Sequence, residues 1–208
     1  MHRNALFCTL AVFSLVYAVV LSGCSNGKSS APTGGAFVNI HVSDPATCSG
    51  PKGTFSHIYV TVTDVQINAA ASAGNNDSGW IDLTPSLSQR PQQVDLLGQA
   101  SNQCFLATLG ATTALQPGTY HQIRIVLASN ATVVTNNVCD SSANCVMLSS
   151  APNIAQPLLL SSEAKTGIKI PSGQIAGGQF VIAAGETKDL DIDFNACSSC
   201  FWPLVSMC

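Results

Sequence analysis

The sequence L-Q-P-G-T-Y-H-Q-I-R-I-V-L-A-S, residues 115–129, is the most informative stretch of this chain about its fold. Pro117 fixes its own backbone torsion and Gly118 tolerates a positive one, so the pair predicts a tight turn. After the turn, Ile123, Ile125 and Leu127 alternate with other residues, which is the period of a half-buried strand. Tyr120 stands beside the turn, where its ring can be buried and its hydroxyl can reach a backbone group, as in the tyrosine corner of sandwich domains. The stretch therefore predicts a structural corner that leads into a strand.

The same alternation recurs along the chain between turn-forming residues, with no helical stripe of useful length between Ala36 and Tyr120. The expected strands are residues 37–43, 57–67, 80–83, 92–97, 103–109, 131–138, 145–148, 157–160, 167–170, 179–183 and 189–194. In strand 57–67 the apolar set changes face after Asp64, which suggests a β-bulge. Turn signals about every ten residues are typical of a sandwich or barrel, so we predict an all-β domain over residues 36–196.

The start of the chain has the order of a bacterial export signal. Residues 1–4 carry a positive charge at Arg3, residues 5–20 are almost wholly apolar, and L-S-G-C ends at Cys24. The tetrad resembles the lipobox of bacterial lipoproteins, in which the cysteine becomes the mature N-terminus and carries fatty acyl chains such as palmitate. Cys24 is therefore the expected lipidation site and residues 1–23 the signal peptide. A transmembrane anchor is disfavoured, because the apolar run is at the short end of the roughly 17–25 residues that a span needs.

The residues after the lipobox predict a tether and a destination. Residues 24–35 contain no large apolar side chain and are expected to be flexible. By the sorting rule of the lipoproteins that it resembles, Ser25 in place of an aspartate implies the outer membrane, on either its periplasmic or its surface side. The membrane, reached through the lipid anchor, is thus the first expected partner.

Composition excludes some other partners. Only 9% of the residues are charged, and the expected mature part holds seven basic residues (the eight of the chain less Arg3) against eleven acidic ones, a balance of −4. The basic residues are dispersed, which excludes nucleic acid as an expected partner, because phosphate neutralisation needs clustered cations. No motif calls for a cofactor.

Cysteine usage predicts disulfides. Besides Cys8 and Cys24, seven cysteines lie in the expected mature part, an odd number, so at least one stays unpaired or pairs between molecules. The first-choice bridge is Cys139–Cys145, which would close a hairpin between strands 131–138 and 145–148. The remaining candidates are Cys48, Cys104 and Cys197. The Cys197-x-x-Cys200 pair lacks the α/β context of a redox motif and the second pair of a zinc site, so accidental thiols or disulfides are the preferred interpretation.

Two clusters of polar side chains are candidates for a metal-binding or partner-binding site. Asp189, Asp191 and Asp193 share one strand face about 7 Å apart, which favours a solvated edge over a calcium site. Residues 69–79 form a polar loop of the kind that all-β proteins display to partners, with oxygen ligands at residues 75–78 but no calcium-loop spacing. No metal site is assigned.

The sequence assigns no catalytic residues. His41, His57 and His121 fall on expected strands opposite the apolar set, and no G-x-S-x-G elbow accompanies them. Trp80 and Tyr59 are possible sugar-stacking residues, and both are as compatible with a core position.

Three segments together resemble a known bacterial lipoprotein family. They are H-I-Y-V-T-V-T-D-V-Q-I at 57–67, V-D-L-L at 94–97 with P-G-T-Y-H-Q-I-R-I at 117–125, and residues 167–194 from G-I-K-I-P-S-G to D-L-D-I-D-F. They are similar to domain of unknown function 4382, and the corner at Leu115, Pro117, Gly118 and Tyr120 also looks like that of prealbumin-like sandwiches of bacterial surface proteins. The resemblance covers residues 37–196. It implies a lipid-anchored Greek-key β-sandwich, prealbumin-like or immunoglobulin-like, and brings no catalytic residues.

The end of the chain departs from this family pattern. Residues 197–208, C-S-S-C-F-W-P-L-V-S-M-C, have no alternation and are expected to be an irregular, Cys-rich tail. Our hypothesis is a truncated or frame-shifted end that leaves the sandwich short of an edge strand.

These observations predict a non-catalytic, lipid-anchored envelope protein with a binding or structural role, toward a glycan or protein ligand, at the cell surface or in the periplasm. A carbohydrate-binding module is the first alternative and an envelope hydrolase the second.

Overall fold

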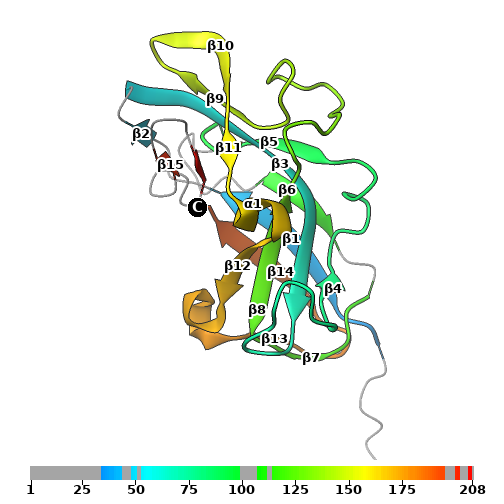
Figure 1. Ribbon diagram of the computed structural model, residues 1–208. Coiled ribbons are helices and arrows are strands. Elements are labelled where there is room, and N and C mark those ends of the chain that lie inside the picture. The colour runs from blue at the N-terminus through cyan, green and yellow to red at the C-terminus, as the bar shows by residue number, and fades with distance from the viewer. Residues whose placement is uncertain are drawn as a thin grey trace, which may run out of the picture. The chain divides into compact units, whose positions relative to one another are not determined.

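The long strand β3 (Gly53–Asn68) organises the larger sheet of the protein. One of its edges pairs with β9 (Cys145–Leu148) and then β8 (Gln122–Leu127), and the other with β2 (Cys48–Gly50), β5 (Gln92–Asp95) and β4 (Ile81–Asp82). The sheet continues with β10 (Ala151–Pro157) beside β9 and β12 (Ile168–Pro171) beside β8. All these pairs are antiparallel, and Figure 1 shows β3 as the long cyan ribbon among them.

The computed structural model describes residues 34–43, 48–50, 53–98, 107–111, 114–194, 200–201 and 206–207. They belong to the compact unit Pro32–Cys208. Strands predominate in them, which confirms the all-β class, while the Greek-key sandwich and its prealbumin-like or immunoglobulin-like type stay predictions. Within these ranges no helix is long and apolar enough to cross a membrane.

A change of register in β3 determines which of its side chains enter the core. The pairing of β3 with β8 shifts between Val62 and Asp64, the sign of a β-bulge. The buried apolar set is Ile58, Val60 and Val62 before the shift and Val65 and Ile67 after it. The predicted change of face after Asp64 is thus confirmed.

A second sheet is built around β1 (Phe37–Ser43), whose bounds are those predicted. Strand β14 (Thr187–Asp193) runs parallel to it on one side and β6 (Ala107–Ala111) antiparallel on the other. Alternate residues of β1 and β14 are buried, namely Val38, Ile40, Val42, Leu190 and Ile192. They join the buried residues of β3 and β8 in one hydrophobic core. The predicted strand 103–109 is present only in part as β6, since residues 103–106 lie outside the described ranges.

The chain bends at Pro117, as predicted, and Tyr120 forms the corner. Gly118, however, does not take a positive φ and already begins β7 (Gly118–Tyr120), which pairs with β13 (Phe180–Ile182). The ring of Tyr120 is 4% exposed, and its hydroxyl donates to the carbonyl oxygen of Gln116 at 2.7 Å. Burial raises the pKa of Tyr120, so the hydroxyl keeps its proton and remains a donor. The residue therefore forms a tyrosine corner that holds the turn before β8 begins.

The chain between β8 and β9 differs from the prediction. Residues 131–138 were expected to be a strand and instead form turns, in which Asn136 adopts a left-handed φ of 57° and Asp140 one of 55°. Asparagine tolerates this conformation and bonds to nearby backbone, as the Asn137 side chain does to the Cys139 amide at 2.9 Å. The predicted hairpin is therefore wrong, because local polar bonding outweighs the weak apolar alternation.

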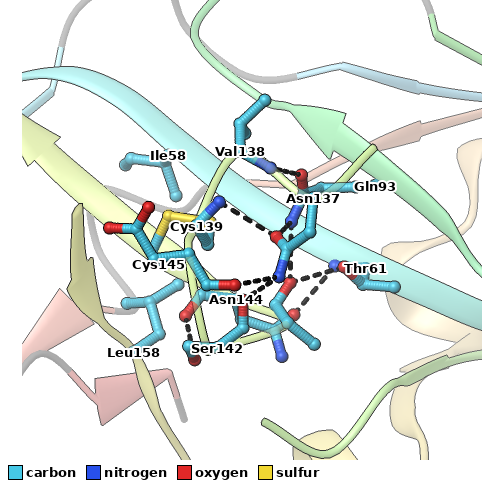
Figure 2. The surroundings of a disulfide bond; sticks show 12 residues. Ile58, Thr61, Gln93, Asn137, Val138, Cys139, Ser142, Asn144, Cys145 and Leu158 are labelled. Carbon is cyan, nitrogen blue, oxygen red and sulfur yellow. Dashed lines mark hydrogen bonds between the residues drawn. A yellow bond between two sulfur atoms is a disulfide. The ribbon is translucent and has the colours of Figure 1, made fainter. Parts of the chain in front are cut away.

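The first-choice disulfide is confirmed inside this turn-rich loop. Cys139 and Cys145 are joined, with their Cα atoms 5.6 Å apart. Figure 2 shows Asn144 beside the bridge, where its Oδ1 accepts the amide of Thr61 on β3 at 2.8 Å and its Nδ2 donates to the carbonyl of Ala128 at 2.9 Å. Asn144 and Thr61 are fully buried. Buried polar groups are stabilising only when bonded, so these contacts hold the loop on the outer face of β3.

The other cysteine predictions are not tested. Cys48 opens β2, and Cys24, Cys104 and Cys197 lie outside the described residues. Their lipidation or pairing stays a prediction.

Two short strands lie in the tail that was expected to be irregular. Strand β15 (Cys200–Phe201) pairs with β16 (Ser206–Met207), which pairs with β11 (Leu159–Leu160). The expectation for residues 197–208 is therefore wrong in this part. Two-residue strands are too short to display an alternating pattern, so the sequence did not reveal them.

A one-turn helix, α1 (Ser162–Thr166), connects β11 to β12 and was not predicted either. The Ser161 hydroxyl accepts the amide of Ala164 at 3.2 Å as a cap, and Gly167 ends the helix with a φ of 114°. Two further 3-10 turns, η1 (Ser172–Gln174) and η2 (Ala176–Gly178), follow β12.

We predict that Tyr120→Phe lowers the free energy of unfolding by about 1 kcal/mol, because it removes one hydrogen bond and leaves the Gln116 carbonyl without its partner. Urea denaturation of the purified domain measures the loss. Tyr59→Phe is the control, and an equal loss in the two variants would contradict a specific role for the corner.

Candidate functional site

The histidines considered for hydrolysis lie apart. His57 Nδ1 is 2.6 Å from Asp95 Oδ2 across β3 and β5. The Nε2 atom of His41, on β1, is 3.9 Å from a carboxylate oxygen of Asp189. His121 lies between β7 and β8. The sequence placed all three on strands but could not show that they belong to separate environments.

The His57–Asp95 pair contains a base and a group that orients it, as a hydrolase requires. The neighbouring hydroxyl of Ser56, however, donates to the backbone carbonyl of Met147 at 3.2 Å. The ring of Tyr59 stacks on the imidazole of His57, with the ring centroids 5.5 Å apart. His57 and Asp95 therefore form a hydrogen-bonded pair, and the hydroxyl of Ser56 bonds to the backbone rather than to the imidazole.

The two aromatic residues considered for sugar stacking do not share a platform. Trp80 precedes Ile81, which pairs with Ile67 near the end of β3, whereas Tyr59 lies near the middle of β3, eight residues or about 27 Å away along the strand. The guanidinium of Arg124 lies 4.1 Å from the ring centroid of Trp80. Both rings therefore already have a stacking partner.

The polar loop 69–79 folds onto the larger sheet instead of projecting as a tip. Three side chains of β8 and β12 donate to its carbonyl oxygens: Gln122 to Ala71 at 2.9 Å, Arg124 to Asn75 at 2.8 Å and Lys169 to Ala73 at 2.8 Å. The indole of Trp80 donates to the carbonyl of Gly74 at 2.9 Å. The donors are distant in sequence, which is why the loop was predicted but its docking was not.

Asp64 and Asp82 form an acidic pair on the face of the larger sheet where the loop 69–79 docks. This pair was not identified from the sequence. Gln66 pairs in register with Asp82 on one side and Arg124 on the other, so a polar row crosses β4, β3 and β8. Gln66 accepts Arg124 Nε at 2.6 Å and donates to the carboxylate of Asp64, two residues earlier on β3. The only signal was the position of Asp64 within an apolar strand, which pointed to the bulge.

The carboxyl group of Asp64 is held partly protonated near neutral pH. Its burial, followed by its hydrogen bond to Asp82 and the charge of Asp82, raises the pKa of Asp64 to about 7, while Gln66 and Arg124 act in the opposite direction. The buried Oδ1 atom of Asp64 accepts no hydrogen bond from the described residues. A proton on Asp64, donated to Asp82, satisfies both groups, as in other pairs of carboxyls that share one proton.

The acidic row on β14 is solvated. Asp189, Asp191 and Asp193 are all exposed, and Asp189 accepts a hydrogen bond from Asn39 at 2.8 Å. In the loop 69–79, Asp77 accepts the amide of Gly74 at 2.7 Å, a local turn contact. Nowhere in the described ranges do three His, Cys, Asp or Glu side chains gather closely enough to hold a metal ion.

A groove of about 810 Å³ lies on the opposite, apolar face of the larger sheet. Its floor consists of buried core residues from both sheets, namely Ile123, Ile125, Leu190, Ile192 and Phe194. Half-buried Ile168 and Ile170 of β12 and Ile175 between the 3-10 turns form one wall, and β14 forms the other. Its volume is within the range of about 300–1,000 Å³ that is usual for ligand sites, and the sequence gave no sign of it because each lining residue looks like core.

Comparison with known proteins adds a family but no activity. Residues 35–201 match the family described as Domain of unknown function (DUF4382). No curated protein and no solved structure matches the chain.

We predict that Asp64→Asn flattens the pH dependence of folding stability. Because the pKa of Asp64 rises from its ordinary 3.8 to about 7 on folding, the folded protein binds this proton more tightly than the unfolded chain does. Wild-type stability should therefore fall as the pH rises from about 4 to 7 and level off above that, by about 1–2 kcal/mol once solvent screening of a half-exposed group is included. Urea denaturation from pH 4 to 8 measures this slope, with exposed Asp193→Asn as the control, and a slope retained in Asp64→Asn would contradict the assignment.

Proposed function

We propose that this chain, which belongs to the DUF4382 family, is a non-catalytic, lipid-anchored protein of the bacterial envelope whose domain binds a ligand in the apolar groove. The observation that carries the binding role is the groove itself. Its apolar floor and walls come from three parts of the chain, β8, β12 and β14, and are open to a ligand. A groove of this volume with an apolar floor and a few polar groups at its rim is a usual form of ligand site.

The anchor is supported by the order of the first residues. The positively charged start, the apolar run and the L-S-G-C tetrad follow one another in the order expected of a lipoprotein signal. Ser25 favours sorting to the outer membrane. Acyl chains on Cys24 would hold the domain at a membrane at about 0.8 kcal/mol per buried methylene.

The contacts of the described residues give no specific support to the two alternatives. Trp80 and Tyr59 are separated and stacked on other side chains, so they offer little to carbohydrate. His57 lacks a nucleophile among its described contacts, so a hydrolase is not proposed.

We expect the mature protein from the membrane fraction to begin at Cys24 and to carry acyl chains. Its intact mass measures lipidation, and the gain in mass on reduction counts the disulfides, of which Cys139–Cys145 should be one. Cys24→Ala should keep residues 1–23 and lose the acyl mass. A wild-type protein that keeps Met1 and carries no lipid would contradict the anchor.

We expect the lipid-free domain to bind an apolar fluorescent dye such as anilinonaphthalene sulfonate in the groove. Ile170→Gln, which places a polar amide on the wall, should abolish most of the fluorescence gain. The matched control is Ile154→Gln, because Ile154 is an exposed isoleucine on β10 outside the groove. Equal binding by the two variants, both with native circular dichroism, would contradict the groove as the binding site.

A further inference from the structure

The groove is bordered by two strand edges that have no partner in the described part of the chain. There β14 pairs only with β1, and β12 pairs only with β8. Consecutive residues of both strands line the groove, Ile168 to Ile170 on β12 and Lys188 to Asp193 on β14 (strands labelled in Figure 1). Side chains of consecutive strand residues point to opposite faces, so the backbone edges themselves must border the groove. An edge presents unpaired N–H and C=O groups that pair readily with another extended chain.

The charges at the rim of the groove determine which side chains a bound extended chain must have. Asp189, Asp191 and Asp193 stand at every second position of β14, about 7 Å apart, and all are exposed. The carboxylates of Asp191 and Asp193 make no ion pair or hydrogen bond with the described residues, whereas their backbones pair with β1. The two lysines of the groove are already engaged, since Lys169 donates to the carbonyl of Ala73 and Lys188 to that of Val181 at 2.6 Å. The groove thus has an apolar floor and a rim with three carboxylates against two ammonium groups, and neither ammonium group forms an ion pair with those carboxylates among the described contacts.

We propose that the groove binds an extended segment of a partner protein in which apolar residues alternate with lysine or arginine. This inference rests on the proposed binding function and names the class of ligand. The segment adds a strand along the edge of β14, places its apolar side chains on Ile123, Ile125 and Ile192, and turns its cations toward Asp191 and Asp193. This is recognition by strand addition, in which the backbone supplies affinity and the alternate side chains supply specificity.

Other occupants fit the rim less well. Two copies of this chain joined through their β14 edges would bring carboxylates face to face, which destabilises a strand pair. An anionic lipid would meet the same repulsion. Charged residues on an edge strand normally prevent such association, and here they also admit a partner of opposite charge.

The test is a binding titration of a labelled peptide, (Lys-Val)₄, with the lipid-free domain, compared with (Glu-Val)₄ and with a peptide that has the same composition as the first in blocks of four. We expect the alternating lysine peptide to bind, the glutamate peptide not to bind, and the block peptide to bind more weakly. Asp191→Asn/Asp193→Asn should weaken binding of the lysine peptide about 5- to 10-fold at low salt, and added salt should reduce that difference. The matched control is Asp77→Asn/Asp140→Asn, which removes the same charge from exposed positions outside the groove and should leave affinity unchanged.

The outcomes separate this inference from the proposed function. Equal loss in the two double variants, or equal binding of the three peptides, would reduce the effect to general charge attraction and overturn the inference. Dye binding in the groove without peptide binding would overturn the inference and leave the proposed function standing. Failure of dye and peptide together would overturn both. A dimer that forms with rising concentration and dissociates in Ile170→Gln would identify a second copy as the occupant and also overturn the inference.

Discussion

The bulge in β3 is the constraint on which the rest of the structure depends. A strand of sixteen residues pairs along both edges with short strands that come from separated parts of the chain. Without the shift between Val62 and Asp64, the two-residue period would turn Val65 and Ile67 toward the polar face. One extra residue therefore allows a single strand to serve one core over its whole length, and it also brings Asp64 to the side that faces Gln66 and Arg124.

The two faces of the larger sheet consequently have different chemistry. The outer face is polar, and two loops are fastened to it by hydrogen bonds from buried or half-buried side chains. The loop 69–79 is held by Gln122, Arg124 and Lys169, and the disulfide loop is held by Asn144 and Thr61. The inner face is apolar and meets the second sheet in one core. Side-chain hydrogen bonds are concentrated on the polar outer face, where the two loops dock, whereas the groove opens on the apolar face.

The unpaired edges explain why a groove exists at all. In the described part of the chain, β12 and β14 are the edge strands of their sheets. No further described strand covers the core between them, and the groove lies there. The exposed carboxylates of β14 place negative charge along this edge. The acidic pair at Asp64 and Asp82 lies on the other face and acts on the stability of the fold, not on the groove.

Features that depend on residues close together along the chain could be predicted from the amino-acid order alone. The corner at Pro117, Gly118 and Tyr120, the strand β1, the change of face after Asp64 and the Cys139–Cys145 bridge each follow from local torsions, a two-residue period or a short loop, and each is present. Local pattern failed where polar turn chemistry outweighed alternation, at residues 131–138, and where elements were too short for a period, at α1, β15 and β16.

Contacts between residues far apart in the chain became visible only in the folded protein. It placed Asp82 and Arg124 on either side of Gln66, docked the loop 69–79 on three strand side chains and left two strand edges beside the same apolar floor. The physical reason is that the alternation of apolar residues in a strand indicates which face of the sheet each residue occupies. The pKa of a residue, its bonding partner and its access to a groove depend instead on strand order and register. Those are set by long-range pairing, and no local pattern encodes them.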